Sequence, residues 1–292
     1  MTDASGRSAT AARPPHPALS PAKSGGEGSK KGRVLAIGGS DSGGGAGIQA
    51  DIKTIAMLGG FAASAITAVT VQDTTGVHAI HPIPPDVVVA QARAVLDDIG
   101  ADAIKTGMLG SAAVVEALAD LFVGVTAPVV IDPVMAATTG AALLDEDAIQ
   151  ALRARLIPLA ALLTPNAPEA ARLTGLDVAT IDDLRRAGQA LLGMGAGAVL
   201  MKGGHVAGES VTDVLMTPTG ETLFVSDRIA ARHTHGTGCT LASACATGLA
   251  QGLDLTAAVE RAHAYVAEAI RQAPGLGRGD GPIDHGWPLR AR

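Results

Sequence analysis

The chain has 292 residues, a formal net charge of −6 and an apolar content of 47%, of which little is aromatic. This acidic balance offers no basic stripe for a nucleic-acid backbone, and the scarce aromatic side chains offer no platform for stacked bases. No uncharged apolar run reaches the roughly 18–20 residues that a bilayer-spanning helix needs. We therefore expect a soluble protein with neither nucleic-acid nor membrane partners.

The first 32 residues are rich in Ser, Pro, Gly, Ala and Lys and carry no periodic apolar residues. Such a segment buries too little surface to offset the entropy lost on ordering. We predict a disordered tail at 1–32 and a single domain at 33–292. The basic residues of the tail leave a transit peptide open as an alternative, but there is no apolar secretory signal, and we expect a cytoplasmic protein.

From Val34 onward, short apolar runs alternate with amphipathic stretches. The first of them predict a strand at VLAIGG, a helix with Ile48, Ile52 and Ile55 at helical spacing, and a strand at FAASAITAVTVQ. The pattern continues with predicted helices near 87–99, 111–122, 147–157 and 181–192, and strands at AIKTG, PVVIDPV, LLTPN and GAVLMKGG.

The last part of the chain predicts an antiparallel hairpin in VLMTPTGETLFV, with its turn at Thr219-Gly220, and then two helices near 238–251 and 255–272. Strands that alternate with helices imply right-handed crossovers and a mostly parallel α/β sheet that is covered on both faces. Cys239 and Cys245 lie six residues apart in one predicted helix, where they are poorly aligned for a disulfide.

Ligands bind at the carboxyl ends of the strands in such a sheet. Six predicted strands end in residues that suit a binding site, so the corresponding loops should converge on one edge. These residues are 41–47, Gln72, Met108, Asp132, Asn166 and 202–204.

The motif HTHGTGCTLASA places Gly236, Thr237, Gly238 and Cys239 at the start of a helix made of small residues. Small residues let backbone N–H groups approach a phosphate closely, and the helix dipole adds positive potential there. This predicts an anion site that could stabilise a phosphoryl group in transfer. A glycine-rich helix start without a ligand is the alternative.

Cys239 has two interpretations. In the first turn of a helix, the dipole can lower a thiol pKa from about 8.5 into a range of about 3.5–7.5, and the thiolate could then accept a proton. Alternatively, it is a small side chain that packs the turn, as most free cysteines are.

The loop SDSGGGAGIQAD contains a weak dinucleotide fingerprint at 45–50, with Asp73 as a possible ribose ligand, but its glycines begin too far beyond the strand. The chain has no P-loop motif. The two histidines beside the helix start, His233 and His235, lack the partners of a zinc site and are expected to form loop hydrogen bonds.

Oxygen ligands follow two other strands, with Asp132 in IDPVM and both Asn166 and Glu169 in TPNAPEA. Carboxylates on separate loops suit Mg²⁺, which also takes water and phosphate oxygens, although Asn166 could equally cap a helix. Lys202 ends an apolar strand, and the glycines after it leave room for a phosphate.

Together, GGSDSGGGAGIQADIKT, TAVTVQDTTGV, KTGMLGS, VVIDPVM, LLTPNAPEA, LMKGGH and HTHGTGCTLASA resemble the hydroxymethylpyrimidine/phosphomethylpyrimidine kinases of the ribokinase-like superfamily. The resemblance covers about 33–288. It implies a three-layer α/β/α fold, usually as a cytoplasmic homodimer. It also implies that ATP and Mg²⁺ are used to phosphorylate hydroxymethylpyrimidine and its monophosphate for thiamine.

The resemblance also implies roles for individual residues. Gln72 should bind the aminopyrimidine, and Ala46, Asp51 and Met108 should line the ring site. Cys239, which stands where most of the superfamily has Asp, would be the general base or an oxyanion contact. The metal would be held by Asp132, Asn166 and Glu169, and the ATP phosphates by Lys202.

Two alternatives to this function stay open. Pyridoxal kinases share the fold and, in some relatives, the cysteine, and pyridoxal also carries a ring hydroxymethyl group. A non-catalytic pyrimidine sensor would need the ring pocket alone. The sequence departs from many relatives at Asp73, where they have Asn, and this could alter substrate preference.

Overall fold

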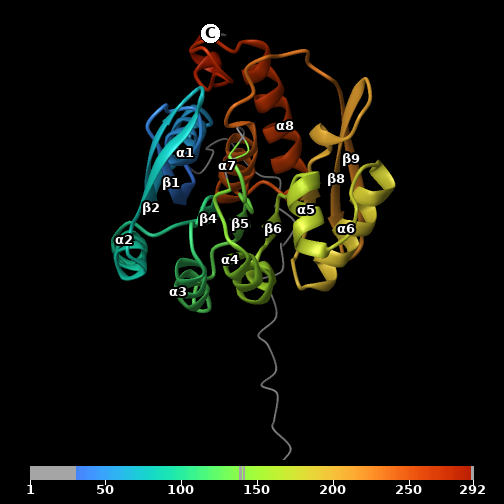
Figure 1. Cartoon of the computed structure of the whole chain (residues 1–292). Coiled ribbons are helices and arrows are strands. Elements are labelled where there is room, and N and C mark those ends of the chain that lie inside the picture. The colour runs from blue at the N-terminus through green and yellow to red at the C-terminus, as the bar shows by residue number, and fades with distance from the viewer. Residues whose placement is uncertain (1–30, 138–139, 141, 291–292) are drawn as a thin grey trace, which may run out of the picture.

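The computed structural model describes residues 31–137, 140 and 142–290, which build one continuous nine-stranded sheet with helices on both faces (Figure 1). The tail predicted at 1–32 lies, apart from its last two residues, outside the described part of the chain. Among the described residues, no helix has both the length and the apolar character that crossing a bilayer requires.

The sheet has a parallel centre and antiparallel edges. Its order is β3-β2-β1-β4-β5-β6-β7-β8-β9, with parallel pairing from β2 to β7 and antiparallel pairing for β3, β8 and β9. The strands are β1 (Arg33–Asp41), β2 (Phe61–Asp73), β3 (Gly76–Pro82), β4 (Ala103–Thr106), β5 (Val129–Ile131), β6 (Leu162–Leu163), β7 (Val199–Met201), β8 (Ser210–Thr217) and β9 (Gly220–Asp227).

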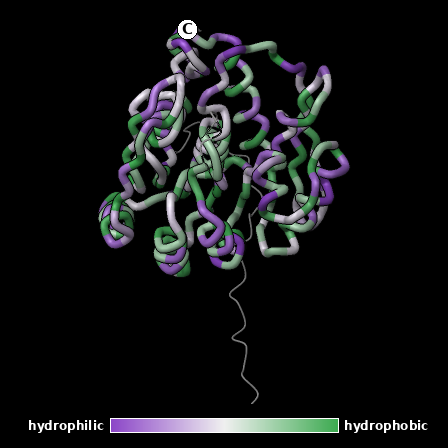
Figure 2. Tube along the Cα trace, in the orientation of Figure 1, coloured by the Kyte–Doolittle hydropathy of each residue, from purple (hydrophilic) through white to green (hydrophobic). Residues whose placement is uncertain are grey.

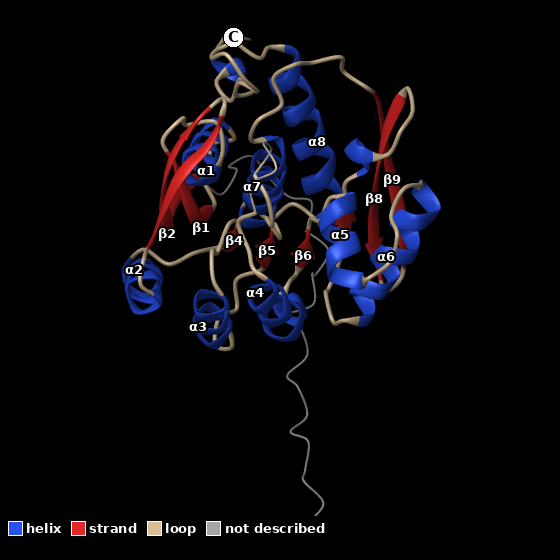
Figure 3. Cartoon of the chain, in the orientation of Figure 1, coloured by secondary structure: helices blue, strands red, loops and turns tan. Residues whose placement is uncertain are grey.

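Two helical layers enclose the sheet, so the predicted three-layer α/β/α fold is confirmed (Figure 3). One face is covered by α1 (Gly47–Met57), α7 (Thr237–Ala250) and α8 (Leu255–Arg271). The opposite face is covered by α2 (Pro85–Asp98), α3 (Ala112–Phe122), α4 (Glu146–Ala151), α5 (Ala167–Thr174) and α6 (Ile181–Gly193).

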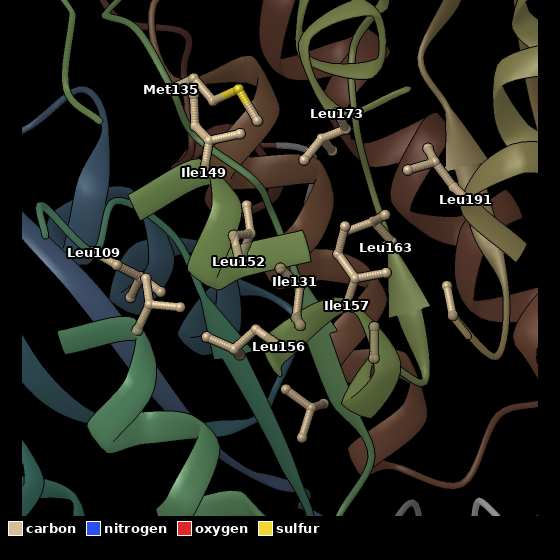
Figure 4. Packing of buried hydrophobic residues seen from close by; sticks show 14 of the residues in the cluster. Leu109, Ile131, Met135, Ile149, Leu152, Leu156, Ile157, Leu163, Leu173 and Leu191 are labelled. Carbon is tan, nitrogen blue, oxygen red and sulfur yellow. The ribbon is translucent and has the colours of Figure 1, made fainter. Parts of the chain in front are cut away.

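Alternation along β1 shows how the sequence specifies two cores. Leu35 and Ile37 belong to the cluster under α2 to α6, whereas Val34 and Ala36 belong to the cluster under α1, α7 and α8. A strand buried on both faces reads as an uninterrupted apolar run, as this one does. Figure 4 shows part of the first cluster, where Ile131 and Leu163 of two neighbouring strands meet leucines of the helical layer.

The outer helices are amphipathic, and α7 is not. Purple and green segments alternate along α2 and α3, as expected for helices with one face in water (Figure 2). In contrast, every residue of 240–250 in α7 is buried. Its small side chains let it pack closely against α1, α8 and the strands, as at Gly248, where an added Cβ would lie 2.7 Å from the Cβ of Ala258. The start of α7 is therefore held firmly in the middle of the molecule.

Three local predictions need correction. The prediction missed β3, which pairs with β2, and β2 itself continues one residue beyond Gln72 to Asp73. The hairpin turns at Pro218-Thr219, because Thr217 pairs with Gly220, one position before the predicted turn. The helix predicted at 147–157 continues past α4 as a π-helical and a 3₁₀ segment.

Candidate active site

A cavity of about 690 Å³ lies at the carboxyl ends of the parallel strands. Ligand pockets commonly enclose about 300–1,000 Å³, so this cavity is large enough for two small molecules side by side. Its walls contain every predicted site residue except Asp51, namely Ala46, Gln72, Met108, Asp132, Asn166, Glu169, Lys202, Gly236, Thr237, Gly238 and Cys239. The loops that the sequence placed at one edge of the sheet do converge there.

The cavity extends across the sheet, with the start of α7 at its centre. Its wall includes Gln72 from β2 near one edge, and Ser226 and Asp227 from β9 at the other. α7 packs over β4 and β5, in the middle of the strand order. A ligand at either end can therefore reach the same helix start.

The first turn of α7 is open toward the cavity. Gly236 precedes the helix with a φ of 88°, and no side chain of the described residues caps it. An added Cβ at Gly236 would lie 1.8 Å from the carbonyl oxygen of Gly45, so only glycine fits. The N–H of Thr237 donates to the carbonyl of Thr234 at 3.2 Å, which leaves the amides of Gly238 and Cys239 at the opening.

A cation and two carboxylates lie against this helix start. Lys202 Nζ donates to Asp132 Oδ1 at 2.9 Å and lies 3.7 Å from Glu169 Oε2. A Cβ added to Gly238 would lie 3.3 Å from Lys202 Nζ and 3.7 Å from Asp132 Oδ2, so glycine keeps the amide close to the ion pair. Lys202, Asp132 and Gly238 thus form one cluster; the first two directly follow β7 and β5, and Gly238 lies in the first turn of α7.

The charges of this cluster shift one another. Burial disfavours the ammonium of Lys202, but the nearby carboxylates of Asp132 and Glu169 outweigh burial and raise its pKa. Burial raises the pKa of Glu169 well above its ordinary value, and Asp132 adds to the shift, while Lys202 opposes it. Two acids therefore share one cation, and the cluster can accept further positive charge.

Asn166 and Glu169 form a capping box at the start of α5. The N–H of Asn166 donates to Glu169 Oε2 at 2.7 Å, and the N–H of Glu169 donates to Asn166 Oδ1 at 2.9 Å. The capping interpretation of Asn166 is thus confirmed, and its amide oxygen is engaged within the chain.

The side chains of this cluster are compatible with a Mg²⁺ ion that phosphate oxygens also bind. Within the described ranges, no three His, Cys, Asp or Glu side chains converge as a metal site. The carboxylates of Asp132 and Glu169 are hard oxygen donors on separate loops, and Mg²⁺ typically takes one or two such groups together with water and phosphate oxygens.

The thiol of Cys239 is half-buried in the cavity wall. Burial raises the pKa of Cys239 to about 11; Lys105 and the N–H of Gly47 act to lower it, and Asp132 and Asp51 act to raise it further. Burial thus opposes the thiolate that the position at the helix start favours, and the role of Cys239 as a general base stays a prediction. Cys239 and Cys245 are both free, as expected.

Asp51 does not line the ring site, contrary to the prediction. Its carboxylate accepts hydrogen bonds from Lys105 Nζ at 2.8 and 2.9 Å and from Ser243 Oγ at 2.7 Å, and both members of the ion pair are fully buried. This pair joins α1, β4 and α7 beneath the cavity. Asp51 is therefore a structural residue that supports the floor of the site.

Asp41 and His235 shape the ring end of the cavity, and the sequence analysis did not predict their contact. Asp41 is buried at the end of β1 and accepts N–H groups from Gly43, Gly45 and Ala46 at 2.8–3.0 Å, which folds the glycine loop around its carboxylate. Despite burial, these amides and His235 lower the pKa of Asp41. His235 Nε2 lies 3.0 Å from Asp41 Oδ2, which ties the loop to the start of α7.

Other loop predictions can be checked directly. His233 Nδ1 accepts from the N–H of Gly281 at 2.9 Å, so it is the loop hydrogen-bonder that was expected. Asp73, the ribose ligand of the dinucleotide alternative, is exposed and bonds to Thr75 and His78 outside this cavity.

Comparison with known proteins places the chain in a family. The model of a family described as phosphomethylpyrimidine kinase matches residues 41–284, which include the whole cluster around Lys202. The chain belongs to the phosphomethylpyrimidine kinase family. The resemblance seen in the sequence motifs is thereby confirmed, and the chain is a kinase by family.

Close relatives match along almost their entire length. A hydroxymethylpyrimidine/phosphomethylpyrimidine kinase of Streptomyces coelicolor is 51% identical over 256 residues, which cover 88% of this chain and 95% of the relative. Among solved structures, a phosphomethylpyrimidine kinase of Clostridium difficile has a TM-score of 0.74 at 39% identity, covering 82% of this chain and all of the other. A pyridoxal kinase of Bacillus subtilis, solved with ADP, has a TM-score of 0.83 at 35% identity, covering 90% and 100%.

Proposed function

We propose that this protein transfers the γ-phosphoryl group of ATP to the hydroxymethyl oxygen of 4-amino-5-hydroxymethyl-2-methylpyrimidine, and then to the phosphate of the monophosphate product. The observation that carries the proposal is the placement of the Gly238 amide against Lys202 and Asp132 at the centre of a cavity that also reaches Gln72. A phosphoryl transfer needs a charge-stabilising centre between two ligand positions, and this cavity provides one.

Each end of the cavity suits one substrate. The end at β1, β2 and β4 is lined by Ala46, Met108 and the amide of Gln72, which suit a methylated heteroaromatic ring. The end at β8, β9 and α8 is lined by residues that include Arg228 and Ile270, and it would take the nucleotide. The two reacting groups would then meet at the start of α7.

The chain's own residues would act chiefly by position and charge. The amides of Gly238 and Cys239 would donate to the oxygens of the transferred group, where negative charge accumulates in the transition state. Lys202 would hold the phosphate chain from the strand side. The thiol of Cys239, whose pKa burial raises to about 11, would form a hydrogen bond at the acceptor oxygen.

Mg²⁺ belongs to the same proposal, with Asp132 and Glu169 as the residues that would hold it, either directly or through water. When bound, the ion supplies positive charge that neutralises the phosphate oxygens. A cytoplasmic location and a homodimer, both expected from the resemblance, are part of this proposal. One relative 51% identical to the chain is named a thiamine biosynthesis bifunctional protein, which supports a role in making the pyrimidine half of thiamine.

Pyridoxal phosphorylation is the second candidate, favoured by the high structural similarity to a pyridoxal kinase. The test is a coupled ADP-release assay with MgATP and each alcohol in turn. We expect kcat/KM for hydroxymethylpyrimidine to exceed that for pyridoxal. A clear preference for pyridoxal would reject the substrate assignment, and ligand binding without ADP release would reject the enzyme in favour of a sensor.

A further inference from the structure

A hydrogen-bonded chain of four side chains reaches the ring end of the cavity. Gln72 Oε1 lies 3.1 Å from Thr70 Oγ1, and Gln72 Nε2 lies 3.3 Å from His235 Nε2. The same His235 atom lies 3.0 Å from Asp41 Oδ2, and Thr70 Oγ1 lies 3.0 Å from the carbonyl oxygen of Ser40. All four side chains line the cavity, so their protons determine what the cavity offers to a ligand.

The proton positions can be worked out from the Asp41 end. Asp41 accepts three backbone N–H groups and is therefore an ionised carboxylate that can only accept. His235 Nε2 must donate to it, because a lone pair on that nitrogen would face the carboxylate at 3.0 Å. An imidazole nitrogen carries at most one proton. If the Gln72 N–H group also pointed at His235 Nε2, two N–H donors would face each other without an acceptor between them.

The Thr70 end is compatible with the same conclusion. Its hydroxyl has one proton and two acceptor lone pairs. That proton can go to the carbonyl oxygen of Ser40 at 3.0 Å or to the side-chain oxygen of Gln72 at 3.1 Å. When it goes to Ser40, Thr70 Oγ1 presents a lone pair to Gln72, which matches an N–H group.

The imidazole is held firmly enough to impose this arrangement. The side chain of His235 is 12% exposed, and a Cβ added to Gly45 would lie 2.5 Å from His235 Cδ2, so the ring rests directly on the glycine loop. Its backbone N–H donates to the carbonyl of Gly281 at 3.2 Å, which fixes the residue on the other side.

We propose that the amide of Gln72 is locked with its oxygen toward His235 and its nitrogen toward Thr70, and that His235, oriented by Asp41, is the positioning residue that sets ring specificity. Half a turn of the amide about its last torsion replaces the contact between two donors at His235 by a Gln72 oxygen that can share the single Nε2 proton with Asp41. One N–H and one carbonyl lone pair of Gln72 then remain for a ligand, in a fixed order along the ring edge.

This order distinguishes two rings of nearly equal shape. A 4-aminopyrimidine offers a donor amine next to an acceptor ring nitrogen, whereas a 4-oxopyrimidine offers an acceptor oxygen next to a donor N–H. A freely rotating amide would match either ring. A locked amide matches only one of the two rings, because the 5-substituent must point toward the start of α7 and this fixes how the ring lies. The inference rests on the proposed function for the ring end, and it adds that this enzyme selects amino over oxo rings through His235.

The test measures binding of two unreactive rings, 4-amino-2,5-dimethylpyrimidine and its 4-oxo counterpart, by calorimetry. His235→Leu removes the donor, and His235→Gln keeps an N–H near the position of Nε2. We expect the parent to prefer the amino ring, His235→Leu to lose roughly three- to tenfold of that preference, and His235→Gln to restore it. The matched control is His233→Asn. His233 lies two residues before His235 in the same loop, but it accepts its hydrogen bond from Gly281 and does not line the cavity, so this variant should keep the preference.

Kinetics provide the second readout. In His235→Leu the KM for hydroxymethylpyrimidine should rise while kcat changes less, since the residues of the first turn of α7 are unchanged. Equal binding of both rings by the parent, or an unchanged preference in a folded His235→Leu, would overturn the lock. If the parent bound the amino ring selectively but released no ADP, the fixed orientation of Gln72 would be supported and the proposed kinase function would be rejected. If the parent bound neither ring, both hypotheses would be rejected.

Discussion

The protonation state of Cys239 gives the sharpest prediction about the chemistry. Burial raises the pKa of its thiol to about 11, with Lys105 opposing and the carboxylates of Asp132 and Asp51 reinforcing the shift. At pH 8, three units lower, only about one thiol in a thousand is ionised. A residue in this state contributes a hydrogen bond and not proton abstraction, so Cys239→Ala should lower kcat by only about tenfold.

The assay is the pH dependence of kcat in the parent, Cys239→Ala and Cys239→Ser. A general base commonly contributes about 10²–10⁴-fold, and a base with this pKa would make kcat rise about tenfold per pH unit up to pH 9. We expect parallel pH profiles for the parent and Cys239→Ala, with Cys239→Ser close to the parent. Alkylation by iodoacetamide should stay slow below pH 9.

Cys245→Ala is the matched background for these measurements. Cys245 is buried within α7 and away from the cavity, so its removal leaves a single thiol to follow. A loss of more than about 10³-fold in Cys239→Ala, together with a pH slope that disappears in the variant, would show that the thiolate is the base. Rapid alkylation with an apparent pKa below 8 would show that burial does not control this thiol.

Three further predictions follow from the same geometry. Lys202→Met should lower kcat by about 10²–10³-fold in the ADP-release assay, and an unchanged kcat would remove Lys202 from the site. Burial lowers the pKa of His285 to about 4, so its stabilising contribution should be complete above pH 6.5 and lost as the pH falls toward 4; thermal melts should show this dependence in the parent and not in His285→Gln. Gly236→Ala should abolish activity and lower Tm because its Cβ would meet the Gly45 carbonyl, whereas Gly252→Ala, with a φ of 90° and open space, should cost only about 1 kcal/mol; equal effects would refute the steric argument.

The strands and helices of the centre could be predicted because burial on both faces leaves a simple apolar signature. The run VLAIGG of β1 is such a case. β3 escaped because most of its residues, including His78, Ile80 and His81, are exposed and show no two-residue alternation. Its pairing with β2 is a tertiary contact, which the local pattern of apolar and polar residues does not predict.

The site was predictable to the extent that it depends on strand ends. A parallel sheet brings those ends together whatever the side chains are, so Asp132, Asn166 and Lys202 could be grouped without coordinates. Asp51 was assigned to the ring site by resemblance, and its place in a buried ion pair beneath the cavity was not recognised from the sequence. Its partner Lys105 lies within an apolar strand, and a buried lysine requires a buried acid, which was the available signal.

The hydrogen bonds that link Asp41, His235 and Gln72 could not be predicted, because they join residues that lie far apart in the sequence. Asp41 is 194 residues from His235, and the contact exists only once β1 and the start of α7 lie side by side. The signal that could have found it was an acid at the end of the first strand, just before three glycines whose amides need an acceptor.

Phosphorus NMR of the complete reaction tests the central claim, that the start of α7 and Lys202 transfer phosphate to a ring alcohol. The protein is incubated with MgATP and 4-amino-5-hydroxymethyl-2-methylpyrimidine, with the 5-methyl ring as the matched control. We predict a phosphomonoester signal followed by the diphosphate signals of the pyrimidine, with one ADP for each phosphoryl group transferred. None of these signals should appear with the 5-methyl ring, and their initial rates should be about 10²–10³-fold lower in Lys202→Met. Binding of the alcohol without a phosphomonoester signal, or equal product from Lys202→Met, would contradict the account.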